Sequence, residues 1–238
     1  HVTVDHSRTV PPQRHRSRRP LMLGRYGLCR AVFNAALVVA LAASLWLPLR
    51  QAAAAAPPVV VVLGDSLTAG FGVNPEEAFP AQLQTYLTAH GVAAKIENAG
   101  VSGDTTAGGR SRLDWALADK PDAVIVELGA NDALRGIDPK AAEANLDAIL
   151  AELKHRGIKV LLCGMLAPPN LGQDYGDAFA ALYPALAKKY QVPLYPFFLD
   201  GVAADQALTQ ADGLHPNAKG VAVIVRRIAP AVEALLKP

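Results

Sequence analysis

From residue 59 onward, short continuous apolar runs recur along the chain and predict buried β-strands. A strand that is covered on both faces shows such an unbroken run, whereas a half-exposed strand alternates between apolar and polar residues. Such runs predict buried strands at Val59–Leu63, Ala123–Leu128 and Ile158–Cys163, and Ala94–Asn98 and Val192–Tyr195 are shorter candidate strands.

Helical spacing of apolar residues separates these runs, and several of the segments carry recognisable start or stop residues. Gly91 and Gly157 end two of them, and Asp138-Pro139 supplies an N-cap and a first helical residue. The expected helices are Ala78–Ala89, Thr105–Leu117, Lys140–His155, Asp177–Tyr190 and Asn217–Leu236. Because strands and helices alternate, we expect βαβ units, an α/β fold with a parallel sheet, and helices on both faces in one domain over 57–238.

Residues 1–56 differ from the rest of the chain and resemble a secretory signal. A basic stretch, Arg14–Arg30, precedes a mostly apolar run, Ala31–Leu49, and an alanine tract that ends at Ala56. We expect cleavage near Ala54–Ala56, a start at Met22, and a periplasmic or secreted mature protein without a stable membrane span. The alternative is an uncleaved anchor, since the apolar run approaches the roughly 20 residues that cross a bilayer.

Charge and cysteine content narrow the classes of protein further. The net charge of +2 conceals a leader at +7 (eight Arg, one Asp) and a body at −5 (15 Lys and Arg, 20 Asp and Glu). An acidic body lacks the basic face of a nucleic-acid-binding protein. Two cysteines cannot form a disulfide framework, and we expect Cys163 to be buried in its strand.

The first strand exit carries a serine in Gly64-Asp65-Ser66-Leu67. Ligands of a parallel sheet bind at the carboxyl ends of its strands, so Ser66 is placed to act as a nucleophile. The alternative is an ordinary serine helix cap. Neither G-x-x-x-x-G-K-[ST] nor G-x-G-x-x-G occurs, and Thr68 stands where the G-x-S-x-G elbow requires glycine.

Three further segments supply the groups that a serine nucleophile needs. Gly103 follows the second strand, and Asn131 follows the third in Gly129-Ala130-Asn131-Asp132. Each could be no more than a turn residue. Asp212-Gly213-Leu214-His215 adds a histidine that neither turn chemistry nor helix capping explains. Together they match a nucleophile, a base, a carboxylate that orients the base, and oxyanion donors.

These four segments resemble the SGNH/GDSL hydrolase superfamily over essentially all of 57–238, and most closely its bacterial branch of acyl-CoA thioesterases, lysophospholipases and arylesterases. The resemblance implies Ser66 as nucleophile, His215 as general base and acid, and Asp212 as the residue that orients His215. It implies an oxyanion hole formed by the Ser66 and Gly103 amides and the Asn131 side chain.

The same resemblance implies a flavodoxin-like α/β/α sandwich whose five parallel strands are ordered 2-1-3-4-5, without metal or cofactor. One departure is Ala130, where the branch often has a second glycine.

The stretch 164–175 is long for a simple connection and, by the resemblance, covers an acyl pocket. We expect Leu166, Leu171 and Tyr175 to line that pocket and to favour fatty or aromatic acyl groups. The expected partner is a small or lipid-like ester or thioester, and a monomer is the default assembly. A carbohydrate or peptidoglycan O-acetylesterase is the alternative on the same fold, and a non-catalytic envelope binding protein is a third reading.

Overall fold

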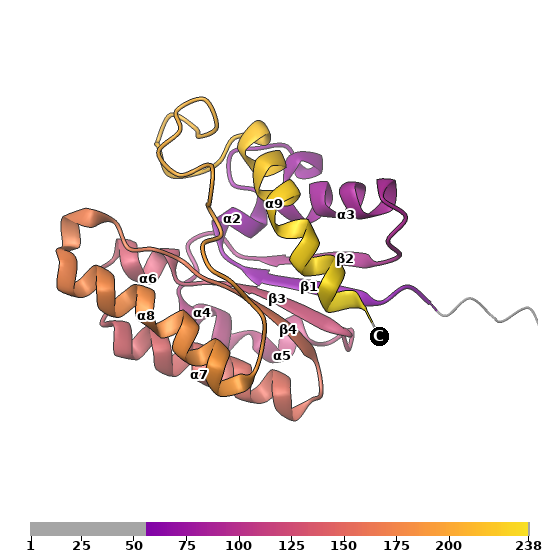
Figure 1. Cartoon of the computed structure of the whole chain (residues 1–238), viewed down its shortest axis with the longest axis horizontal. Coiled ribbons are helices and arrows are strands. Elements are labelled where there is room, and N and C mark those ends of the chain that lie inside the picture. Colours follow the sequence, from indigo (N-terminus) through magenta and orange to yellow (C-terminus); the bar gives the residue numbers. More distant parts are fainter. Residues whose placement is uncertain (1–55, 238) are drawn as a thin grey trace, which may run out of the picture. The chain divides into compact units, whose positions relative to one another are not determined.

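A computed structural model of the chain describes residues 56–237. These residues fold around a parallel sheet in the order β2-β1-β3-β4-β5, as predicted (Figure 1). The strands are β1 (Val59–Gly64), β2 (Lys95–Gly100), β3 (Ala123–Glu127), β4 (Lys159–Cys163) and β5 (Leu194–Tyr195). The leader prediction falls on residues outside the described range, apart from Ala56.

The continuous apolar runs lie at the centre of the sheet. β1 and β3 pair in register from Val60 with Ala123 to Gly64 with Glu127, and both strands are almost entirely buried. β2 is an edge strand that pairs only with β1. Its residues are more polar and more exposed than those of the central strands, as is usual at the edge of a sheet. Cys163 is buried at the end of β4, as expected.

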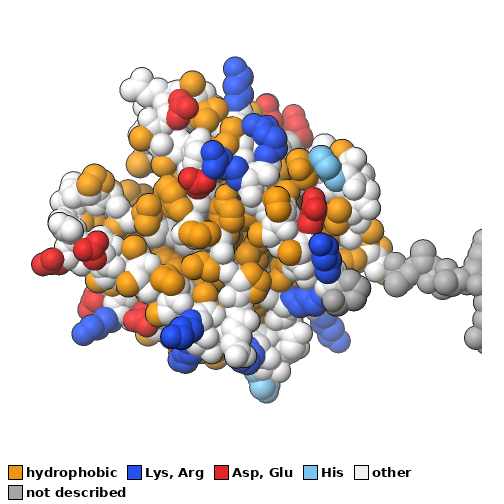
Figure 2. Space-filling view, viewed as in Figure 1, with side chains coloured by type: hydrophobic (Ala, Val, Ile, Leu, Met, Phe, Trp, Pro, Cys, Tyr) orange, Lys and Arg blue, Asp and Glu red, His pale blue; other side chains and the backbone are white. Residues whose placement is uncertain are grey.

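Helices cover both faces of the sheet, giving three layers (Figure 1). One face carries α3 (Phe79–Ala89) and α9 (Ala218–Leu236), which pack on each other. The helices of the other face are α4 (Thr106–Ser111), α5 (Leu113–Ala116), α7 (Pro139–His155) and α8 (Gln173–Tyr190). Figure 2 shows hydrophobic side chains gathered across the middle of the face in view, with charged side chains mainly around its outline.

Two of the predicted helices differ from the structure. The segment expected as one helix over 105–117 is interrupted at Arg112, whose backbone has φ −108° and ψ 13°. The helix expected from Asp177 begins instead at Gln173, directly after Gly172 with φ 86°. Gly176 obscured this start in the sequence, since glycine is a weak helix former.

Short helices at the strand exits were not predicted. α2 (Ser66–Ala69) follows β1 directly, and α6 (Ala130–Leu134) follows β3. Two 3₁₀ turns, Pro75–Glu77 and Pro169–Leu171, complete the connections. These pieces are too short to show a helical hydrophobic period, but they carry the residues at the carboxyl edge of the sheet. Between residues 56 and 237, no helix combines the length and the apolar character needed to cross a membrane.

Candidate active site

Ser66 lies on a tight turn at the exit of β1, as the first residue of α2. Asp65 caps this short helix by accepting a hydrogen bond from a backbone amide of the helix at 2.9 Å. A Cβ on Gly64 would lie 2.0 Å from Thr68 Oγ1 and 2.6 Å from Glu127 Oε2. Only glycine therefore lets the chain turn this closely against the end of β3.

The structure brings His215 to Ser66 across 149 positions of sequence, with 2.9 Å between Ser66 Oγ and His215 Nε2. His215 belongs to the loop between β5 and α9, which is closed by an antiparallel bridge between Thr209 and Pro216. The meeting of serine and imidazole that the sequence predicted is thus present.

Asp212 binds the other ring nitrogen of the same histidine. The distance from His215 Nδ1 to Asp212 Oδ2 is 2.6 Å, and Asp212 Oδ1 accepts from the amides of Leu214 and His215. The hydrogen bond from His215, followed by those from the two amides, lowers the pKa of Asp212 to about 2. An ionised Asp212 favours the tautomer in which Nδ1 carries the proton, so that Nε2 can accept from the serine hydroxyl.

Gly103 and Asn131 follow the neighbouring strands β2 and β3, and Asn131 lines the same cavity as Ser66 and His215. Gly103 has φ +84°, in the left-handed region that favours glycine. Asn131 Nδ2 donates to Asp65 Oδ2 at 3.2 Å and to the Asp104 carbonyl at 2.9 Å. Within residues 56–237, the backbone amides of Ser66 and Gly103 donate to no other residue.

Two buried carboxyl groups, those of Asp65 and Glu127, form hydrogen bonds with the turn that carries Ser66. Glu127, fully buried at the end of β3, accepts from Thr68 Oγ1 at 2.8 Å and from the Asp65 amide at 3.4 Å. Burial, and next the charge of Asp65, raises the pKa of Glu127 well above its usual value. Burial also raises the pKa of Asp65 to about 6. Burial thus favours the protonated form of Glu127, whereas the hydrogen bonds from the Leu67 amide and from Asn131 favour the ionised form of Asp65.

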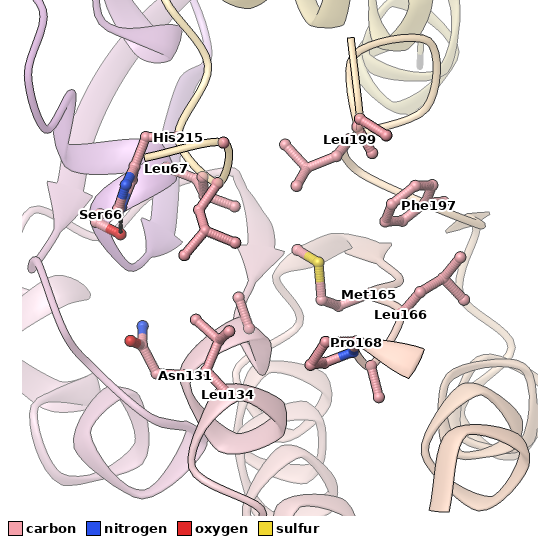
Figure 3. A pocket seen from close by; sticks show the side chains of 16 residues that line it. Ser66, Leu67, Asn131, Leu134, Met165, Leu166, Pro168, Phe197, Leu199 and His215 are labelled. Carbon is pink, nitrogen blue, oxygen red and sulfur yellow. Dashed lines mark hydrogen bonds between the residues drawn. The ribbon is translucent and has the colours of Figure 1, made fainter. Parts of the chain in front are cut away.

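An apolar cavity of about 270 Å³ opens beside Ser66. Figure 3 shows Ser66, His215 and Asn131 on one side of it, facing Met165, Phe197 and their apolar neighbours on the other. Beyond those three polar side chains, the lining consists of Leu67, Ala130, Leu134, Met165, Leu166, Ala167, Pro168, Phe197, Leu199, Ala203, Ala204, Gly213 and Leu214. Such a wall favours acyl chains or rings over sugar hydroxyls, which would lose hydrogen bonds to water.

Of the pocket residues expected from the sequence, only Leu166 lines this cavity. Leu171 lies in the 3₁₀ turn, and Tyr175 lies in the first turn of α8 rather than in a loop. The Tyr175 hydroxyl donates to the Ile137 carbonyl at 2.7 Å, and its ring stacks on Phe179. The early start of α8 thus directs Tyr175 toward Ile137 and Phe179 and away from the cavity.

Sequence reasoning missed several residues of the site. Glu127 reads as part of an apolar strand, and its role depends on Thr68, which comes from another element. Leu134, Phe197 and Leu199 carry a weak signal, namely apolar side chains just beyond strand ends where turns are usually polar.

Among the described residues, no group of three or more His, Cys, Asp or Glu side chains is arranged to hold a metal ion.

Comparison with known proteins agrees with this geometry. The model of the GDSL-like Lipase/Acylhydrolase family matches residues 62–223. Esterase TesA of Pseudomonas aeruginosa is 40% identical over 183 residues, which cover 76% of this chain and 91% of that protein. The "Thioesterase 1/protease 1/lysophospholipase L1" of Escherichia coli is 41% identical over 174 residues, covering 73% of this chain and 82% of the relative. The crystal structure of AlinE4, an esterase of the SGNH-hydrolase family, superimposes with a TM-score of 0.64 at 49% identity, covering 76% and 98% of the two chains.

Proposed function

The chain belongs to the GDSL-like lipase/acylhydrolase family and is a hydrolase of esters or thioesters, and from this premise we propose that it is an exported serine hydrolase of apolar acyl esters. The observation that carries the proposal is the 2.9 Å contact between Ser66 Oγ and His215 Nε2 at one end of an apolar cavity. The hydroxyl is the nucleophile, and the cavity receives the acyl group.

In the first half of the reaction, Ser66 Oγ attacks the carbonyl carbon while His215 Nε2 takes the hydroxyl proton. The amides of Ser66 and Gly103 donate to the oxyanion that forms, and Asn131 Nδ2 joins them by giving up the longer of its two bonds, the one of 3.2 Å to Asp65 Oδ2. Asp212 holds the ring through Nδ1 and stabilises the imidazolium without taking the proton.

In the second half, His215 returns the proton to the leaving alcohol or thiol as the carbon–oxygen or carbon–sulfur bond breaks. An acyl group then remains on Ser66. Water, deprotonated by the same imidazole, attacks that acyl group, and the collapse of the second tetrahedral intermediate releases the acid and restores the serine.

The experiment that tests this proposal measures hydrolysis of p-nitrophenyl esters from C2 to C16, together with an acyl thioester and a lysophospholipid. We expect the rate to rise beyond C2, because the apolar wall gains contact with a longer chain. A preference for acetyl esters alone would support the O-acetylesterase alternative instead.

Ser66→Ala is the decisive variant, with Ser111→Ala as its matched control. Ser111 is an exposed serine on α4 whose hydroxyl donates only within its own helix, to the Gly108 carbonyl. Ser66→Ala should lower kcat by about 10⁶-fold without lowering the Tm, as loss of the nucleophile does in other serine hydrolases. Retention of most of the esterase rate, or failure of a fluorophosphonate to label Ser66, would contradict the proposal.

Export is part of the proposal and rests on the basic, apolar and alanine-rich order of residues 14–56. N-terminal sequencing of protein secreted by an expressing bacterium should give a start just after Ala54–Ala56. A mature form that still contains Trp46 would contradict cleavage there.

A further inference from the structure

Arg112 occupies the break between α4 and α5, where the backbone leaves helical geometry. Its side chain is largely buried, with 15% of its surface exposed, although arginine usually extends into solvent. A buried guanidinium needs partners for its donors, so the contacts that it makes indicate what it holds.

The guanidinium binds acceptors from three separate segments at the carboxyl edge of the sheet. Nε donates to Asp104 Oδ2 at 2.5 Å, Nη1 to the Ala99 carbonyl at 2.7 Å, and Nη2 to the Gly64 carbonyl at 2.8 Å. Gly64 ends β1, Ala99 lies near the end of β2, and Asp104 follows the turn that comes after β2. A planar fork with fixed directions can join three such groups, whereas a lysine ammonium on a flexible chain cannot fix their geometry.

All three proposed oxyanion donors are close in sequence, or hydrogen-bonded, to a residue that Arg112 binds. Arg112 binds the Gly64 carbonyl, and Ser66 lies two residues further along the chain. Arg112 also binds Asp104, and Gly103 directly precedes it. The Asp104 carbonyl accepts from Asn131 Nδ2 at 2.9 Å, which connects the third donor to the same segment. Asn131 also donates to Asp65, so the serine turn, the Gly103 turn and α6 form one hydrogen-bonded unit.

We propose that Arg112 is a positioning residue that holds the three oxyanion donors in the geometry of the transition state. Oxyanion stabilisation depends on donors that are already in place when charge develops, and displacement by about 1 Å can cost about 10²-fold in rate. Arg112 touches no reacting atom and acts through the backbone of Gly64 and through Asp104. The inference rests on the proposed serine hydrolase mechanism.

The competing account is that Arg112 only stabilises the fold. In that case, replacing Arg112 would lower the Tm but would not weaken binding of the transition state more than binding of the substrate. A positioning role predicts a loss in kcat with little change in KM, and an equal loss in affinity for a molecule that mimics the tetrahedral intermediate.

The test compares Arg112→Lys, which keeps the charge and loses the fork, with Arg156→Lys. Arg156 is the matched control, because its guanidinium also binds acceptors from separate segments, the side chains of Glu152 and Asp114, but lies at the opposite end of the sheet, beyond α7. For Arg112→Lys we expect kcat to fall by about 10–10²-fold with KM within about 3-fold. An alkyl trifluoromethyl ketone, which adds to Ser66 and forms an oxyanion, should bind weaker by the same factor as kcat/KM. Arg156→Lys should keep both values.

Asp104→Asn provides a second test if Arg112→Lys does not fold. It removes the charge that Arg112 binds and keeps the Asp104 carbonyl that Asn131 needs. We expect a smaller loss of kcat, about 3–10-fold, again matched by weaker binding of the ketone.

The proposal is overturned if folded Arg112→Lys and Asp104→Asn retain the wild-type kcat, or if their loss appears in KM while ketone affinity is unchanged. Those results leave the serine mechanism intact, because the wild-type protein and Ser66→Ala are measured in the same assay. A wild-type protein that hydrolyses none of the esters would overturn both proposals.

Discussion

The serine turn and the histidine loop meet at one hydrogen bond, but they are held in different ways. Around Ser66, the side chains of Asp65, Thr68 and Glu127 are fully buried and bonded to elements distant in sequence. His215 and Asp212 are more exposed, with 21% and 36% of their side-chain surfaces accessible, and Asp212 bonds only within its own loop.

Phe198 and Val202 anchor the first part of the histidine loop in the core, whereas few contacts besides the Ser66 bond connect its residues 210–215 to the rest of the protein. Gln210 Nε2 donates to the Phe71 carbonyl at 2.7 Å, and the Phe71 ring lies 4.6 Å from the His215 ring, centre to centre. The difference teaches that the nucleophile and the oxyanion donors are positioned by the core, whereas the base is positioned by local bonds. Substitutions in the loop should therefore act mainly on activity, and substitutions of the buried side chains that hold the serine turn should change activity and stability together.

The largest effect that sharpens this comparison is expected for Asp212→Asn. The amide would hold the histidine in the wrong tautomer, and kcat should fall by about 10⁴-fold, as for other triads. Because solvent screens the exposed Asp212, the loss of its charge should lower the Tm at neutral pH only modestly. Steady-state kinetics and thermal unfolding measure the two quantities, and Asp200→Asn, an exposed partner of Arg227, serves as control. A kcat within tenfold of the wild-type value would contradict the role assigned to Asp212.

The low pKa of Asp212 adds a pH dependence with a defined sign. Its folded-state pKa of about 2 lies below the ordinary value of 3.8, so its interactions stabilise the fold above pH 3.8 and are lost as the pH falls toward 2. Asp212→Asn should remove that part of the acid sensitivity of the Tm.

Asn131→Ala should have the second-largest effect, and it should lower both kcat and the Tm. Loss of one oxyanion donor costs about 10²–10³-fold in kcat in other enzymes. The variant also leaves the buried Asp65 with one partner fewer, so the Tm should fall as well. Activity assays and calorimetry on the same preparation test the pair of effects. A fall in kcat with an unchanged Tm would show that the serine turn is less dependent on these bonds than its burial suggests.

Phe71→Ala should have a smaller effect, confined to activity. Aromatic pairs contribute about 0.5–1.5 kcal/mol, which corresponds to a loss of about 2–10-fold in kcat if the ring holds His215 in place. Because 52% of Phe71 is exposed, the Tm should change little. Phe71→Leu is the conservative comparison, since it retains apolar contact and loses the ring stacking. Equal rates for the wild type and both variants would show that the local bonds of the loop suffice.

The smallest effect on activity is expected for Glu127→Gln, which should act on the pH dependence of stability. The raised folded-state pKa of Glu127 means that the folded protein binds a proton that the unfolded chain releases above the ordinary value of 4.5. Stability should therefore fall as the pH rises above that value, and less steeply in the variant. Thermal unfolding from pH 5 to pH 8 measures the slope, with the exposed Glu76→Gln as control. An identical slope in the wild type and in Glu127→Gln would exclude a protonated Glu127.

The sequence by itself determined the sheet and the places where chemistry could occur. Unbroken apolar runs indicated strands covered on both faces, their alternation with helices favoured a parallel sheet, and the strand order followed from the family resemblance. The carboxyl ends of parallel strands share one edge, so Ser66, Gly103 and Asn131 could be placed together before any coordinates were known. His215 was the one histidine of the body that capping and turn chemistry did not explain.

Only the tertiary structure decided which partners these residues have. Arg112 reads as a residue of a helix, and its three acceptors come from segments whose approach no local pattern encodes. Glu127 reads as part of a strand, and Tyr175 reads as a pocket residue, although the early start of α8 directs it to the Ile137 carbonyl. The physical reason is that periodicity records which side of an element is buried, whereas hydrogen bonds and cavities depend on atoms that distant elements bring to within a few ångströms.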